Sequence, residues 1–148
     1  MSAAPALLLV GALTSCAVPL RSLDPSRAIA PEDRIELLRQ DGFEVFTAPT
    51  VRRAPAFLEA TFVARQLAAE PNAARLTTFD VVTWIDLDRD GLQDPEERAR
   101  QDRVVEPSGT RGAVLQVVTP FEPGYPVRFR LQMTLGGTPV LRVGELAY

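Results

Sequence analysis

Apolar and polar residues alternate along much of the chain beyond residue 43, a pattern that predicts short β-strands with one buried face. The clearest case is the segment 127–135, where Val, Phe, Leu, Met and Leu alternate with Arg, Arg, Gln and Thr. Further segments either alternate or are rich in β-branched and aromatic residues, and Gly or Pro residues separate them: 43–47, 57–67, 77–85, 113–119 and 140–148.

The spacing of these segments favours a single, mostly β domain in which two sheets pack face to face. We expect an immunoglobulin-like β-sandwich of about seven short strands with one or two short helices. The single tryptophan, Trp84, falls on a predicted central strand. We expect it to be a buried anchor of the core, as large aromatic side chains usually are.

The segment that precedes the first clear strand has two readings. Pro31 and the two acidic residues after it suit a helix N-terminus, and Gly42 suits its C-terminal cap. The alternative is a β-hairpin that turns at Asp41–Gly42 and pairs Arg39 with Glu44. We prefer the helix.

The last two strands also leave a choice of register. A two-residue turn at Gly136–Gly137 would place Arg142 opposite Leu131. A three-residue loop ending at Thr138 would instead pair Leu131 with Val143 and keep one apolar face continuous. We therefore expect the three-residue loop.

Composition narrows the possible functions. The chain has 148 residues, 46% of them apolar, and a formal net charge of −3. This charge gives no reason to expect a nucleic-acid partner. The absence of His removes the commonest general base and the usual zinc ligand, and a single Cys cannot form an intrachain disulfide.

The N-terminus carries a targeting signal. Residues 3–13 are apolar but too few to cross a bilayer as a helix, and Leu13-Thr14-Ser15-Cys16 follows. This tetrad is similar to the lipobox of bacterial lipoproteins. The resemblance implies a signal peptide over 1–15, a lipid on Cys16, a tether over 16–30 and a domain over 31–148, held at a membrane of the bacterial cell envelope, on its periplasmic face or at the surface. The alternatives are an ordinary secretory signal with a chance Cys, or a buried apolar strand.

The segment 86–97 has the residue types and spacing of a calcium-binding loop. Acidic residues occupy loop positions 1, 3, 5, 9 and 12, and Gly91 stands at position 6, where a sharp turn is needed. The segment resembles the calcium loops of EF-hands and of thrombospondin type-3 repeats. The predicted Ca²⁺ ligands are Asp86, Asp88, Asp90, the Leu92 carbonyl, Asp94 and Glu97.

Two features depart from an EF-hand. The segment before the loop reads as a strand rather than a helix, and position 8 is Gln93 rather than an aliphatic residue. After the loop, Asp94 and Pro95 are typical of a helix start, which predicts a short helix over 95–101. A solvated acidic turn without metal is the simpler alternative.

These observations predict a lipid-anchored, calcium-stabilised envelope or surface module that is not an enzyme. It either binds an unknown protein or glycan or is purely structural. The alternative is a calcium-dependent extracytoplasmic hydrolase or hydrolase accessory domain. That activity would need two converging carboxylates, for which Glu59 and Glu122 are conceivable but unmarked by any motif.

Overall fold

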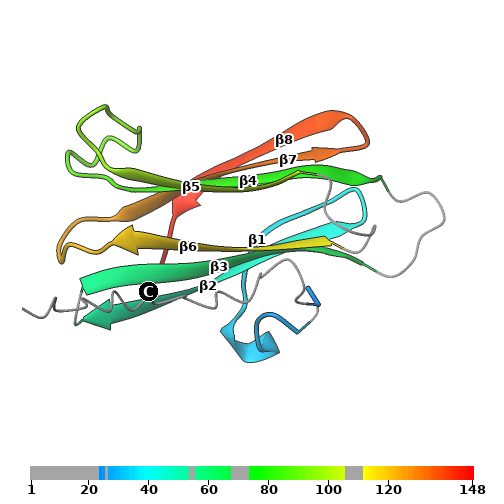
Figure 1. The fold of residues 1–148 in the computed structure, drawn as a ribbon, viewed down its shortest axis with the longest axis horizontal. Coiled ribbons are helices and arrows are strands. Elements are labelled where there is room, and N and C mark those ends of the chain that lie inside the picture. The colour runs from blue at the N-terminus through cyan, green and yellow to red at the C-terminus, as the bar shows by residue number, and fades with distance from the viewer. Residues whose placement is uncertain (1–23, 26, 54–55, 68–73, 106–111) are drawn as a thin grey trace, which may run out of the picture.

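The computed structural model describes residues 24, 25, 27–53, 56–67, 74–105 and 112–148. The predicted signal peptide over 1–15 and Cys16 lie outside the described residues. Within them, eight strands form two four-stranded antiparallel sheets that face each other (Figure 1). The strands are β1 (Ile35–Gln40), β2 (Phe43–Arg53), β3 (Ala56–Gln66), β4 (Leu76–Ile85), β5 (Ala99–Val105), β6 (Gly112–Pro120), β7 (Val127–Leu135) and β8 (Thr138–Glu145).

The strand order is β1-β2-β3-β6 in one sheet and β5-β4-β7-β8 in the other. The prediction of a mostly β, sandwich-like domain is thus confirmed. The order does not reproduce an immunoglobulin domain, in which the first, second, fifth and fourth strands make one sheet. No α-helix occurs in the part of the chain that the structure describes; a single 3-10 turn, η2, spans Pro31–Asp33.

The core lies between the two sheets and is built from alternate residues, as the sequence predicted. On β7, every second residue from Val127 to Leu135 is buried. Phe62 of β3 and Phe129 of β7 meet across the gap with ring centroids 5.8 Å apart. Full burial of such large side chains contributes about 1.5–3 kcal/mol each to folding. Their collective burial makes the two sheets a rigid support for the loops at either end.

The segment before β2 is a hairpin, so the helix prediction over 31–41 is wrong. Arg39 pairs with Glu44 across β1 and β2. The turn between them consists of Asp41 and Gly42, with φ values of 48° and 77°. Two successive left-handed residues are what a two-residue hairpin turn requires, and Asp-Gly supplies them at low cost. The helix-start signal at Pro31 produces only the 3-10 turn.

The register of β7 and β8 is also the one we did not prefer. Leu135 pairs with Thr138 around a two-residue Gly136–Gly137 turn, and Leu131 lies opposite Arg142. The φ values of the two glycines are 54° and 83°, again the left-handed pair that a tight hairpin needs. Turn geometry therefore outweighs a continuous apolar face on this edge strand.

The bounds of the other predicted strands can be compared with the observed ones. The segments 57–67, 77–85 and 113–119 correspond closely to β3, β4 and β6. The predicted strand 43–47 continues to residue 53 and includes Pro49. The pairing with β1 ends at Thr47, so the Pro49 nitrogen has no β1 strand beside it that would need a hydrogen bond.

The chain before β1 covers the outer face of the β1-β2-β3-β6 sheet. Ile29 is buried against Phe46 and Val63 in a second, smaller apolar cluster. Arg34 donates two hydrogen bonds to the Ile29 carbonyl, at 3.0 and 3.1 Å, and its guanidinium lies 4.7 Å from the centre of the Phe46 ring. These contacts fix residues 29–34 on the sheet.

Candidate metal centre

The acidic segment joins β4 to β5, whose last pair is Trp84 with Ala99. It is therefore the long connection of a β-hairpin. The helix predicted over 95–101 is wrong: the chain makes a turn in which the Glu97 N–H donates to the Asp94 carbonyl at 3.0 Å, and β5 begins two residues later. Pairing with the open edge of β4 satisfies more backbone groups than a single helical turn would.

Asp86, the first predicted ligand, is fully buried at the end of β4. Its Oδ2 accepts hydrogen bonds from the Gly91 N–H at 3.1 Å and from Arg128 Nε at 2.9 Å. Its Oδ1 is buried and has no hydrogen-bond partner within the described residues. A buried acceptor without a partner costs about 1–3 kcal/mol. A cation bound at Oδ1 would therefore remove this free-energy cost.

The surroundings of Asp86 keep its carboxyl charged. Burial raises the pKa of Asp86, but hydrogen bonds from Arg128 and from the backbone of Gly91 and Arg89 outweigh it, and the pKa lies below the usual value. The position-1 residue therefore carries a negative charge at neutral pH even without an ion.

The middle of the loop is shaped by its own carboxylates. Asp88 Oδ1 accepts from the Asp90 N–H at 3.2 Å, and Asp90 Oδ1 accepts from the Leu92 N–H at 2.7 Å. The residues between these bonds, Arg89 and Gly91, have left-handed backbone angles, with φ values of 64° and 81°. Nothing lies within 4 Å of a Cβ added at Gly91, so the requirement there is conformational rather than steric.

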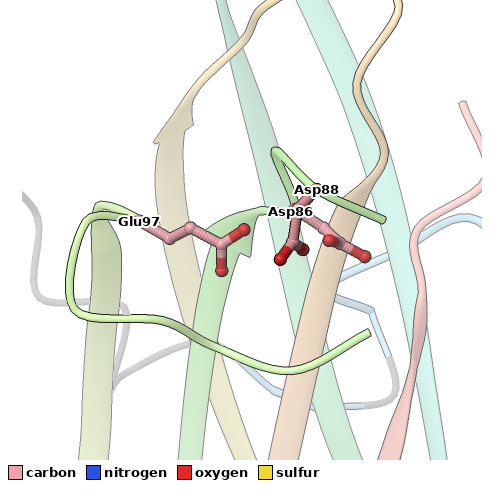
Figure 2. A group of neighbouring side chains, drawn as sticks. All are labelled: Asp86, Asp88 and Glu97. Atoms are coloured by element: carbon pink, nitrogen blue, oxygen red, sulfur yellow. The ribbon is translucent and has the colours of Figure 1, made fainter. Parts of the chain in front are cut away.

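Glu97, the predicted bidentate ligand, folds back over the loop and is nearly buried, with 6% of its surface exposed. One oxygen accepts from the Leu87 N–H at 2.7 Å and the other from the Asp94 N–H at 3.0 Å. Figure 2 shows its carboxylate reaching from one side of the loop towards those of Asp86 and Asp88. Glu97 therefore closes the loop by contacting both of its ends.

The five acidic ligands form two overlapping groups. Carboxylate oxygens of Asp86, Asp88 and Glu97 lie within 4.8 Å of one another, and those of Asp88, Asp90 and Asp94 do likewise. Asp88 belongs to both groups. These clusters could hold a metal ion, because an oxygen-rich, flexible and strongly negative site suits a hard divalent cation.

The predicted backbone ligand has a different contact. The Leu92 carbonyl accepts a hydrogen bond of 3.0 Å from the Trp84 indole N–H. Trp84 is buried as expected, but it lies on the opposite face of β4 from Phe79 and Val81, which face the inter-sheet core. Trp84 therefore packs beside the acidic loop and holds its backbone through this hydrogen bond. The Leu92 carbonyl keeps a second lone pair.

Crowding of like charges is visible at Asp94. Burial raises the pKa of its carboxyl, and the neighbouring negative charges of Asp90, Asp88, Glu97 and Glu96 raise it further. A doubly charged ion would remove this repulsion.

Sequence reasoning did not predict Arg128 as part of the site. It lies on β7, and the pairing of β4 with β7 sets it opposite Trp84, next to the loop. Its side chain also pairs with Glu145 of β8 at 3.4 Å. The alternation of β7 marks Arg128 as outward-facing, but only the register places it beside Asp86.

Comparison with known protein families and with curated proteins finds no match for this sequence. The geometry of the loop and the pattern of its residues are therefore the basis of the functional argument.

Proposed function

We propose that the chain is a lipid-anchored, calcium-stabilised binding or structural module of the bacterial cell envelope, without enzyme activity of its own. One observation carries the calcium part of this proposal. The Oδ1 atom of Asp86 is buried without a hydrogen bond, and the carboxylates of Asp88 and Glu97 lie close by. A cation among these oxygens would remove the desolvation cost of Oδ1 and the mutual repulsion of the acids.

Calcium is the cation that the loop suits best. Ca²⁺ accepts six to eight oxygen ligands in adaptable geometry, whereas Mg²⁺ demands a near-ideal octahedron and retains several waters. The acidic positions and Gly91 follow the order of a calcium loop. The Gly91 N–H donates to Asp86 Oδ2, which leaves Oδ1 for the ion.

The proposed role of the ion is structural. It would close the long β4–β5 connection, which contacts the rest of the domain mainly through Arg128, Trp84 and the Arg89–Gly124 hydrogen bond. Extracellular calcium modules have dissociation constants of about 10⁻⁴–10⁻³ M. Calcium at tenfold above its dissociation constant would stabilise the fold by about 1.4 kcal/mol.

The proposed localisation of the module depends on the lipobox-like tetrad that ends at Cys16. Its thiol would carry the lipid and tie the domain to a membrane. Among the described residues, no helix is long and apolar enough to cross a membrane.

We also propose that the module binds a protein or glycan partner whose identity is unknown. The hydrolase alternative would need two carboxylates converging in a cleft. Of two pockets formed by described residues, one is lined by a single acidic residue, Glu145, and the other by none.

Thermal unfolding of the full-length chain, in excess chelator and then in millimolar calcium, tests the metal site. We expect calcium to raise the Tm of the wild type by about 5 °C. Asp88→Asn should lose most of this gain, because Asn keeps the oxygen that accepts the Asp90 N–H but lacks the charge.

Asp33→Asn is the matched control, since Asp33 is an exposed acid on η2, outside both acidic groups. It should keep the full gain. Identical melting curves in chelator and in calcium would eliminate the calcium site.

Membrane fractionation tests the anchor separately. Cys16→Ala should move the protein from the membrane fraction to the soluble fraction, because the acyl chains supply the binding energy. Retention of the variant on membranes would count against lipidation of Cys16.

A further inference from the structure

A second site adjoins the acidic loop. Arg89 of that loop, the β6–β7 connection and the end of β8 enclose an open pocket of about 420 Å³. The residues that line it are Arg89, Gly124, Tyr125, Pro126, Arg128, Glu145 and Tyr148. Two arginines, one glutamate and two tyrosines are thus among the lining residues.

The polar groups of the pocket are held in place. Arg89 donates to the Gly124 carbonyl at 2.7 Å. Arg128 is fixed between Asp86, at 2.9 Å, and Glu145, at 3.4 Å. A guanidinium has five N–H donors, so each arginine keeps donors that these contacts do not use. Anchored side chains lose little entropy when a ligand binds.

The Tyr148 side chain is also anchored. The Tyr148 ring meets the Phe121 ring edge-on, with centroids 5.1 Å apart, and its hydroxyl donates to the Tyr125 carbonyl at 3.4 Å. Tyr148 is nevertheless 53% exposed. An exposed but fixed aromatic ring offers a flat apolar surface with a polar edge.

We propose that this pocket binds a saccharide that carries a carboxylate group, and that an ion in the acidic loop strengthens the binding. The guanidinium groups match a carboxylate in a bidentate manner. The tyrosine rings match the apolar face of a sugar ring, and Glu145 accepts hydrogen bonds from sugar hydroxyls. The negative charge of Glu145 disfavours a doubly charged phosphate monoester group, which has no hydroxyl of its own to donate in return.

Arg128 couples the two sites. Without an ion it is the cation that neutralises Asp86. A divalent ion at Asp86 Oδ1 takes over that role and repels Arg128, so the field at the pocket becomes more positive. An anion in the pocket offsets this repulsion. Each ligand therefore raises the affinity for the other, as linkage requires. The coupling rests on the proposed calcium site; the saccharide pocket does not.

The test is a chemical-shift titration of the full-length chain in mild detergent with glucuronate, in excess chelator and in millimolar calcium. Methyl glucoside, which lacks the carboxylate, is the matched probe. We expect glucuronate to bind about tenfold more tightly in calcium, a coupling of ordinary size, and methyl glucoside to bind weakly in both states.

Two variants identify the residues responsible. Arg89→Gln should weaken glucuronate binding by about tenfold. Arg130→Gln is the control, because Arg130 lies on the same outward face of β7 as Arg128 and does not line the pocket. It should bind glucuronate like the wild type.

The outcomes separate the two proposals. Calcium binding without glucuronate binding in either state overturns the pocket and leaves the metal site standing. Equal glucuronate affinity in chelator and calcium overturns the coupling. Full affinity in Arg89→Gln means that Arg89 does not hold the carboxylate, which also overturns the pocket as proposed. Absence of calcium binding refutes the metal site and the coupling, whereas glucuronate binding in chelator would still support the pocket.

Discussion

The β1–β2 and β4–β5 hairpins close in different ways. The first uses two residues, Asp41 and Gly42, whose left-handed conformations are sufficient to reverse the chain. The second uses the acidic segment 86–98, which depends on groups from elsewhere: Arg128 neutralises its buried carboxylate and Trp84 supports its backbone. The first turn is determined locally, whereas the second depends on tertiary charge and, in our proposal, on an ion.

The largest expected effect follows from removing the protein's own counter-charge. Arg128→Met leaves the Asp86 carboxylate buried without its cation, which costs about 3 kcal/mol when one partner of a buried pair is lost. Urea unfolding in chelator measures this loss. Arg130→Met, on the same strand face and exposed, should change stability little.

Calcium should restore part of the stability that Arg128→Met loses, because the ion supplies the missing positive charge. A loss below about 1 kcal/mol in chelator would mean that Arg128 does not compensate Asp86 and that the two hairpins differ less than we argue.

The pH dependence of stability provides a second test of the difference between the two hairpins. The Asp86 pKa lies below its usual value, so its ionised form stabilises the fold above the unfolded-state pKa, and this stabilisation is lost as the pH falls through the folded-state pKa. In chelator, Asp86→Asn should be less stable than the wild type near pH 7. The loss should be smaller than in Arg128→Met, because the Arg128 side chain is 25% exposed and stays solvated.

The difference between wild type and Asp86→Asn should shrink as the pH falls, and thermal unfolding at several pH values measures it. A gap that stays constant into acid would show that the Asp86 charge is irrelevant. The corresponding amide variant of the short hairpin, Asp41→Asn, should show no comparable gap.

The smallest expected effect on stability comes from replacing the turn glycines Gly42 and Gly91. Gly42 and Gly91 have φ values of 77° and 81°, so Gly42→Ala and Gly91→Ala should each cost about 1 kcal/mol in chelator. In calcium, only Gly91→Ala should fall further behind the wild type, because its strain distorts the ion site. Thermal melting of both variants in both conditions measures this, and equal calcium gains in the two would contradict the distinction.

The sequence predicts those parts of the fold that depend on local alternation. Every second residue from Val127 to Leu135 is buried because a strand exposes its side chains to opposite sides. Two predictions failed because turn chemistry was given too little weight: helix-capping signals were preferred to the Asp41–Gly42 turn, and a continuous apolar face to the Gly136–Gly137 turn. Both dipeptides form left-handed two-residue turns, and these turns fix the register of the strands that they join.

The candidate site was predictable in its acids but not in its partners. The spacing from Asp86 to Glu97 indicated which carboxylates would gather, since the ligands of a short loop are constrained by the chain itself. Arg128 comes from a strand 42 residues away, and its approach to Asp86 depends on strand pairing that no local pattern encodes. Trp84 was expected in the core, but its position one residue after an inward-facing Thr83 places it under the loop.

Because Ile29 is packed on the outer face of the sheet, its position limits the length of the tether between the domain and a membrane. If Cys16 carries the lipid, at most the twelve residues 17–28 separate the bilayer from Ile29, which is fixed on the domain. A fully stretched chain of that length spans about 40 Å. The domain would therefore work close to the membrane surface, and its partners would have to come to that surface, since the tether is too short to carry the domain far into the surrounding compartment.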